Sequence, residues 1–168
     1  QEPPEFDILT WNADGTNLPA GLYRDFVELL RHNPLVEPGA LEVLGSRVDL
    51  SQVKVPTFIA GAVADHLTPW RQTYRTGQLM GGESVFALSS AGHIASLVNP
   101  PGNPRASYAM APVVTGETAE QWQRRATTRP GSWWEAWAAW MLERSGTPRP
   151  AADQDAQRFG DGYFNRWF

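Results

Sequence analysis

Two stretches of the sequence decide the fold: residues 55–70 read VPTFIAGAVADHLTPW, and residues 84–94 read SVFALSSAGHI. Each begins with a short apolar run rich in β-branched and aromatic residues, which is typical of a buried β-strand. The residues between the runs predict a helix that is capped by Thr68, has Pro69 in its first turn and ends at Gly81-Gly82. Strand, helix and strand in this order indicate a βαβ unit of a parallel sheet.

One reactive side chain follows each strand: Asp65 follows the first and His93 follows the second. Neighbouring parallel strands lie about 5 Å apart, and reactive groups gather beyond their carboxyl ends, so we expect these side chains to meet. A carboxylate that accepts a hydrogen bond from one imidazole nitrogen leaves the other free to take a proton from a nucleophile. Acid before histidine is also the order of the last two triad members in α/β-hydrolases. The alternative is a helix cap or Asx-turn at Asp65 and an ordinary loop position for His93.

The nucleophile that such a pair would activate is missing from the chain. The sequence contains no cysteine, and it has neither a G-x-S-x-G nor a G-x-C-x-G motif. An α/β-hydrolase carries its nucleophile upstream of the acid and the histidine, on a turn of this kind. The residues alone therefore provide an acid and a base without the group on which they would act.

Several motifs together resemble the C-terminal catalytic part of a polyhydroxyalkanoate (PHA) synthase. They occur in the order of that family from about Phe6 to Gly146, which is most of the chain. The Trp-rich end and the Asn-Pro-Pro segment resemble the single-subunit synthases of classes I and II more than the two-subunit type. The motifs are WNAD at 11–14 with NLP at 17–19, EPGAL at 37–41, DHLTPW at 65–70, AGHI at 91–94, VNPP at 98–101 and GSWW at 131–134.

The resemblance implies an α/β-hydrolase that polymerises (R)-3-hydroxyacyl-CoA into polyester and releases CoA through a cysteine nucleophile. His93 would be the base that deprotonates the cysteine. Asp65 would be the acid member, which activates the 3-hydroxyl of the incoming monomer directly or through the histidine. Secondary candidates for positioning substrate are His66, Trp11 and Asn12. The alternative for Trp11 and Asn12 is a packed Trp beside a turn, and the alternative for His66 is an ordinary loop histidine.

The resemblance also implies partners and a location. The partners are the N-terminal half of the synthase, which would carry the cysteine, the acyl-CoA with the growing polyester chain, the PHA granule surface and a possible homodimer. The location is the cytoplasm, at PHA granules. We expect this segment alone to be inactive and to need its missing half for stability, because a parallel strand pair leaves an open edge.

Composition excludes several other classes of protein. A net charge of −4 and a pI near 5.3 argue against a nucleic-acid partner. No apolar run reaches the roughly 18 residues of a membrane span. Three scattered histidines without metal-ligand spacing predict no metal site, and no motif predicts a cofactor.

We expect the C-terminal part of an α/β-hydrolase fold, with its last strands and helices and a Trp-rich C-terminal helical segment. Residues 1–45 would form the junction between cap and core, and residues 46–101 the core that carries the acid and the histidine. Residues 102–146 would form the C-terminal helices, and residues 147–168 a tail.

Local patterns predict the remaining elements. They predict an extended run at Phe6–Trp11, an amphipathic helix over residues 18–32, a loop at Tyr108–Thr115 and a short helix over 118–127. Ser132 and Glu135 form the pattern of a capping box, so a helix would run from there to about Arg144. We expect the apolar stripe of the helix at 18–32 to contact the core and the tryptophans of the last helix to pack on the sheet; contact of the last helix with a granule or a partner is the alternative. These apolar residues are Leu22, Phe26, Leu29 and Leu30 in the first helix, and Trp133, Trp137 and Trp140 in the last.

Two other functions fit the same residues. A lipase-like hydrolase with an upstream nucleophile would use the same pair, and a serine rather than a cysteine in the upstream motif would favour it. A binding or scaffold module could retain the fold without the activity. A reading frame that encodes no nucleophile upstream would favour that module.

Overall fold

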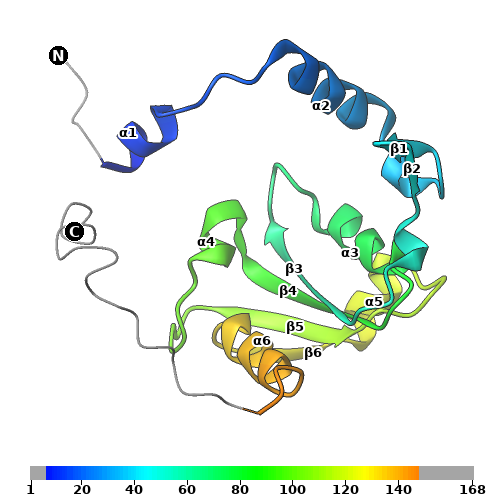
Figure 1. Cartoon of the computed structure of the whole chain (residues 1–168). Coiled ribbons are helices and arrows are strands. Elements are labelled where there is room, and N and C mark those ends of the chain that lie inside the picture. Colours follow the sequence, from blue (N-terminus) through cyan, green and yellow to red (C-terminus); the bar gives the residue numbers. More distant parts are fainter. Residues whose placement is uncertain (1–6, 148–168) are drawn as a thin grey trace, which may run out of the picture.

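The structure, a computed structural model, describes residues 7–147 of the chain (Figure 1). The predicted tail at 147–168 therefore lies outside the described residues apart from its first. The elements in chain order are α1 (Asp7–Ala13), α2 (Ala20–His32), η1 (Pro34–Val36), β1 (Leu41–Val43), β2 (Ser46–Val48), η2 (Leu50–Gln52), β3 (Thr57–Ala64), α3 (Trp70–Leu79), β4 (Ser84–Gly92), α4 (His93–Leu97), β5 (Ser107–Pro112), α5 (Ala119–Arg125), β6 (Thr127–Pro130) and α6 (Trp133–Leu142).

Four strands form the central sheet, in the order β3-β4-β5-β6. β3 and β4 are parallel with α3 between them, which confirms the predicted βαβ unit. β5 and β6 continue the sheet in antiparallel fashion. The prediction of a loop at Tyr108–Thr115 is therefore wrong for the residues up to 112, which belong to β5. The region 102–146 thus contains two strands as well as its helices. β5 lacks a strong strand pattern, but its backbone pairs with the buried strand β4, and this tertiary pairing overrides local propensity.

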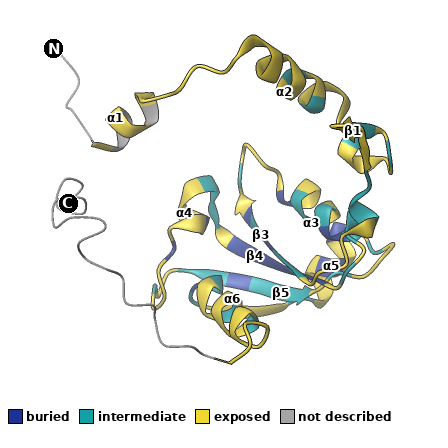
Figure 2. Cartoon of the chain, in the orientation of Figure 1, coloured by how far each residue is buried: buried dark blue, intermediate teal, exposed yellow. Residues whose placement is uncertain are grey.

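One face of the sheet is covered by α3 and α5 and contains the core. Its centre is an aromatic cluster in which Phe86 of β4 and Trp122 of α5 lie 4.8 Å apart between ring centroids. Gly77 lets α3 approach the sheet, since a Cβ there would lie 2.8 Å from a Val113 methyl and 3.0 Å from Ile59 Cδ1. Figure 2 shows the buried residues concentrated in these strands and helices. The core residues are Ile59, Trp70, Tyr74, Phe86, Leu88, Ala119 and Trp122.

The opposite face of the sheet is covered by α6. Phe58 neighbours Ile59 along β3, so its side chain points away from the α3 face. Its ring stacks on Trp133 at 6.1 Å and meets Trp140 edge-on at 5.7 Å. The predicted packing of the Trp-rich helix on the sheet is confirmed for these two residues.

The helix ends show which capping predictions hold. Thr118 and Gln121 form a full capping box at the start of α5. Ser132 caps α6, as predicted. Its hydroxyl accepts from the backbone N–H of Trp134, whereas a capping box would use that of Glu135. The helix ends at Leu142, before the predicted end near Arg144. The prediction that Thr68 caps α3 is wrong: Pro69 is the N-cap residue, and no side chain caps this end of the helix.

The N-terminal elements lie apart from the sheet. The extended run predicted at Phe6–Trp11 is wrong, because α1 occupies residues 7–13 with Asp7 in its first turn, where a carboxylate favours a helix. α2 is the predicted helix, but none of its residues is buried. Figure 1 shows α1 and α2 in an arc outside the sheet. The apolar stripe of α2 therefore does not reach the core formed by the described residues, contrary to expectation.

Candidate active site

The pairing of β3 with β4 brings the two candidate residues together. Ala62 pairs with Ser89, whereas Ala64 pairs with Gly92, so two steps along β3 match three along β4. This irregularity is a bulge-like shift of the kind found beside active sites. It aligns the last paired residues of both strands, and the residues that come next are Asp65 and His93.

Asp65 and His93 form a hydrogen-bonded pair. Nδ1 of His93 lies 2.8 Å from Oδ2 of Asp65. The Asp65 side chain is 7% exposed and the His93 side chain is 34% exposed, so the imidazole is the member that reaches the surface. The predicted meeting of the two side chains is therefore confirmed. Their catalytic role remains a prediction.

The loop after β3 holds the carboxylate of Asp65 with three further donors. The backbone N–H groups of Leu67 and Thr68 donate to Oδ1 at 2.9 and 2.8 Å, and the Thr68 hydroxyl donates to Oδ2 at 2.7 Å. These bonds hold the pKa of Asp65 well below its usual range, chiefly through the Thr68 N–H and then through His93 and the Thr68 hydroxyl, although burial opposes them. Asp65 thus makes both the Asx-turn of the alternative interpretation and the bond to the histidine.

The ionised carboxylate determines which tautomer His93 adopts. A carboxylate can only accept hydrogen bonds, so Nδ1 of His93 carries a proton and donates a hydrogen bond to Asp65. Nε2 of the neutral imidazole then has a free lone pair on a side chain that is partly open to solvent. This arrangement can remove a proton from a group placed near Nε2.

The secondary candidates lie in different places. The His66 ring lies edge-on to the His93 ring, with 6.3 Å between centroids, so His66 is beside the pair. Trp11 is 73% exposed on α1, which Figure 1 shows well away from the ends of β3 and β4. Asn12 is on the same helix, but its side chain lies outside the described part of the chain. Of the two candidates whose side chains the structure describes, His66 lies beside the pair and Trp11 does not.

Thr68 belongs to the site, although the sequence pattern predicts a different role for it. It was expected to cap a helix, whereas its hydroxyl and N–H both bind the carboxylate of Asp65. The Asp-x-x-Thr spacing is the signal that could have identified it, because an Asp that closes a turn commonly accepts from donors two and three residues later.

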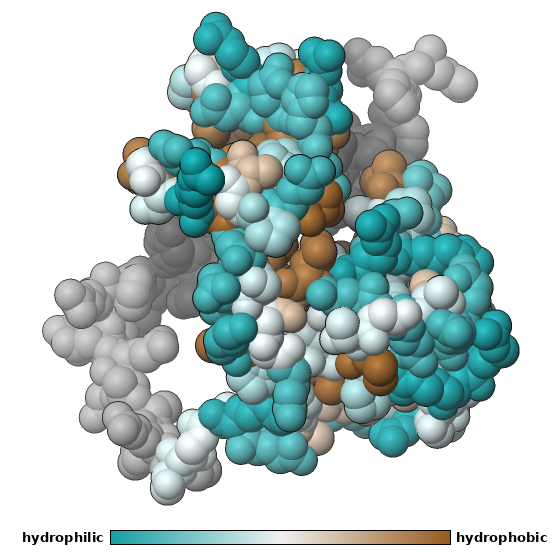
Figure 3. All heavy atoms as spheres, turned by 90° about the vertical axis from the view of Figure 1, so that its right-hand side faces the viewer, coloured by the Kyte–Doolittle hydropathy of each residue, from teal (hydrophilic) through white to brown (hydrophobic). Residues whose placement is uncertain are grey.

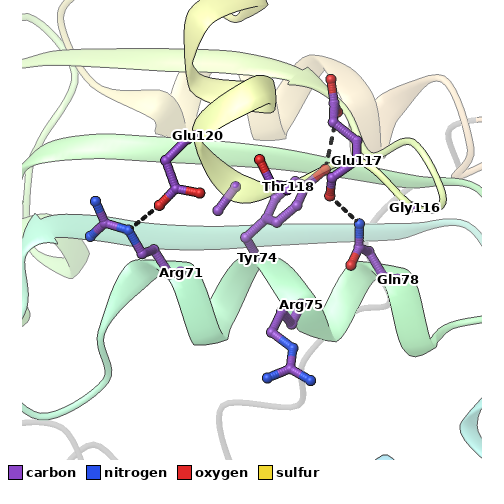
Figure 4. Close-up of a pocket in the computed structure, with 9 residues that line it drawn as sticks. Arg71, Tyr74, Arg75, Gln78, Gly116, Glu117, Thr118 and Glu120 are labelled. Atoms are coloured by element: carbon purple, nitrogen blue, oxygen red, sulfur yellow. Dashed lines mark hydrogen bonds and ion pairs between the residues drawn. The ribbon is translucent and has the colours of Figure 1, made fainter.

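A separate hollow of about 330 Å³ lies between α3 and α5 (Figure 4). Of its charged side chains, Arg71 pairs with Glu120, and Glu117 accepts from the Tyr74 hydroxyl and from Arg125, which does not itself line the hollow. The bond from Arg125 is the largest cause that lowers the pKa of Glu117. Burial is the largest cause that raises the pKa of Tyr74, followed by its bond to Glu117. The hollow is a polar interface that joins two helices, and neither member of the Asp65–His93 pair lines it.

Within residues 7–147, no three His, Cys, Asp or Glu side chains are grouped so that they could bind a metal ion. Across the same residues, the helices are too short or too polar to cross a lipid bilayer.

A βαβ unit with an Asp after its first strand and a His, bonded to that Asp, after its second defines this chain as part of an α/β-hydrolase fold. The chain is 46% identical over 145 residues to poly(3-hydroxyalkanoate) polymerase 1 of Ectopseudomonas oleovorans, a match that covers 86% of the chain and 26% of that protein. It is 39% identical over 153 residues to the poly(3-hydroxyalkanoate) polymerase subunit PhaC of Cupriavidus necator, covering 89% of the chain and 25% of that protein.

A third relative, poly(3-hydroxyalkanoate) polymerase of Methylorubrum extorquens, is 36% identical over 153 residues, covering 89% of the chain and 25% of that protein. No protein-family model matches the chain. The sequence is homologous to a C-terminal segment of the poly(3-hydroxyalkanoate) polymerases, the family that its motifs resemble. It spans about a quarter of the length of these curated relatives.

Proposed function

We propose that this chain supplies the acid and the base of a poly(3-hydroxyalkanoate) polymerase. The polymerase would join (R)-3-hydroxyacyl-CoA monomers into polyester and release CoA. The observation that carries the proposal is the 2.8 Å bond between Asp65 and His93 at the ends of two neighbouring parallel strands. The relatives that match this chain are named as polymerases of this kind, which supports the same conclusion.

In this mechanism Nε2 of His93 takes the proton from a cysteine thiol supplied by the N-terminal half of the polymerase. The thiolate attacks the thioester carbonyl of the acyl-CoA, which forms a bond from acyl carbon to cysteine sulfur and breaks the bond to the CoA sulfur. The CoA thiolate leaves with the proton held by His93. Asp65 keeps the imidazole in the productive tautomer and stabilises its charged form.

Chain growth requires a 3-hydroxyl group to attack the next acyl thioester and to lose its proton. Two routes exist for this proton, to Asp65 directly or to His93. Both oxygens of Asp65 already accept hydrogen bonds, Oδ1 from two backbone N–H groups and Oδ2 from His93 and Thr68. Because its acceptor positions are occupied, we place the activation of the hydroxyl at His93, with Asp65 acting through it.

The remaining assignments belong to the same proposal. His66 lies beside the pair and would contact the bound acyl-CoA. The polymerase would work in the cytoplasm at the surface of the polyester granule, with the N-terminal half as its required partner and a homodimer as its assembly.

The decisive experiment replaces His93 with Gln in the full-length polymerase. CoA release from a 3-hydroxyacyl-CoA should fall by several orders of magnitude, as it does when a catalytic base is removed. His66→Gln is the matched control, because it changes a neighbouring imidazole that does not bind Asp65, and it should lower the rate far less. Near-normal CoA release by His93→Gln would refute the role of His93. Ester hydrolysis without polymer would instead indicate a lipase-like enzyme.

A further inference from the structure

The helix that carries His93 is short and only partly packed. α4 spans five residues, starts at His93 itself, and leaves Ile94 and Leu97 exposed. A single helical turn has little stability of its own. The position of the imidazole therefore depends on what other elements do for α4.

The N-terminus of α6 supplies one hydrogen bond to α4 and one to the segment that follows this helix. Trp133 Nε1 donates to the carbonyl oxygen of Ser96 at 2.9 Å, and Ser132 Oγ donates to that of Asn99 at 2.6 Å. The last carbonyls of a helix lack partners within it. Trp133 serves one of them, and Ser132 holds Asn99, which lies two residues beyond Leu97, the last residue of α4. Ser96 Oγ donates in turn to the carbonyl oxygen of His93 at 2.9 Å. A series of hydrogen bonds thus connects α6, through Ser96, with the backbone of His93.

Both donors are held in place by their own contacts. Ser132 is 1% exposed, and its oxygen also accepts from the N–H of Trp134, so the hydroxyl is fixed as donor and acceptor. The Trp133 ring stacks on Phe58 of β3. β3 is the strand that ends one residue before Asp65. α6 therefore connects β3, the strand that leads to Asp65, with α4, the helix that begins at His93. This connection is separate from the Asp65–His93 hydrogen bond.

We propose that Ser132 and Trp133 are positioning residues that hold His93 at bonding distance from Asp65 and at the correct angle to the substrate. This inference rests on the proposed function, because the placement of His93 affects the rate only if His93 is the base. Neither residue touches the reacting atoms: Trp133 acts through the backbone of α4, and Ser132 through the backbone of the segment that follows it.

The test uses Trp133→Phe in the full-length polymerase. This change keeps an aromatic ring next to Phe58 and removes the N–H donor together with part of the indole, a loss of volume that the control below shares. The kcat of CoA release should fall about tenfold or more, with KM changed less than twofold, because a displacement of about 1 Å at a catalytic group can cost about a hundredfold in rate. Trp134→Phe is the matched control: it changes the neighbouring indole, which is 41% exposed, and should leave kcat unchanged.

A second measurement separates positioning from a loss of general stability. The proton on Nδ1 that is shared with Asp65 should give a far-downfield proton NMR resonance, identified by its loss in His93→Gln. Trp133→Phe should shift or broaden this resonance, and Trp134→Phe should leave it unchanged. Ser132→Ala is the second variant. If it fails to fold because α6 loses its cap, Trp133→Phe decides the question alone.

The outcomes distinguish this inference from the proposed function. Normal kcat and an unchanged resonance in Trp133→Phe would overturn the inference, as would a loss confined to KM. If His93→Gln itself retained CoA release, the proposed function would fail, while the resonance in Trp133→Phe would still show whether α6 positions the histidine.

Discussion

At the scale of single residues, Asp65 combines two duties that are usually treated as alternatives. Its Oδ1 closes the turn after β3 by accepting from Leu67 and Thr68, while its Oδ2 accepts from His93 and the Thr68 hydroxyl. The turn bonds prevent the carboxylate from rotating, so the imidazole meets an acceptor of fixed direction. Preorganisation of this kind is what a catalytic acid–base pair requires.

The Thr68 hydroxyl makes this arrangement testable. It helps to lower the pKa of Asp65, so the stabilisation it provides is complete above the unfolded-state pKa of about 3.9 and declines as the pH falls towards the lower folded-state value. Thr68→Val removes the hydroxyl and keeps the shape. Unfolding by denaturant should therefore show a loss of stability that is the same at pH 7 and pH 5, where Asp65 is ionised, and that shrinks only as the pH falls through the lowered folded-state pKa. Thr68→Ser, which retains the hydroxyl, should behave as the wild type, and a loss of stability that Thr68→Ser shares with Thr68→Val would exclude the hydroxyl as its cause.

At the scale of elements, α3 determines how closely the helical layer approaches the sheet. Gly77→Ala would place a methyl group 2.8 Å from Val113 and 3.0 Å from Ile59. Such overpacking costs about 1–3 kcal/mol, which outweighs the gain of up to about 1 kcal/mol from alanine in a helix. We expect a net loss of about 1 kcal/mol or more in the unfolding free energy of the full-length protein.

Gly21→Ala is the matched control for this substitution. Gly21 is also in a helix, α2, but a Cβ there would have no atom within 4 Å. This variant should be neutral or more stable by up to about 1 kcal/mol. If the two substitutions changed stability equally, close packing at Gly77 would not be the cause.

The elements also show what a sequence can and cannot reveal. β3 and β4 were predictable because their apolar runs are buried and bounded by breakers, and the positions of Asp65 and His93 follow from the strand ends. β5 was not, because the segment SYAMAP has no β-branched residue and owes its conformation to pairing with β4. The shift between Ala62 and Ala64, which aligns the pair, depends on backbone geometry that no periodicity encodes.

At the scale of the whole molecule, the described residues leave much apolar surface uncovered. Leu30 of α2 is 83% exposed and Leu44, between β1 and β2, is fully exposed. Figure 3 shows such apolar side chains gathered along a hollow of the surface. A cavity of about 470 Å³ between α2 and the β1–β2 hairpin is lined partly by the apolar residues Leu29, Leu41 and Val43. Isolated soluble domains rarely expose apolar groups in this number.

β3 adds an unpaired sheet edge, since β4 is its only strand neighbour among residues 7–147. An open edge of this kind binds other strands. The relatives are about four times longer than the matched segment, so their remaining residues are sufficient to cover both the edge and the apolar surface. We therefore expect the 168 residues produced alone to associate, to bind an apolar dye and to unfold without a cooperative transition.

Co-expression with the N-terminal half of a polymerase, as a separate chain, should reverse all three properties, because β3 then gains a neighbouring strand and α2 a partner. Light scattering after gel filtration, dye fluorescence and denaturant unfolding measure them. Substitution of β3 residues 60 and 62 by Pro should abolish the rescue, since each proline removes a backbone donor of this strand; the same change at the exposed residues 114 and 115, beyond the end of β5, is the control. A monomeric sample of the isolated chain that unfolds cooperatively would show that the segment is complete as a folding unit.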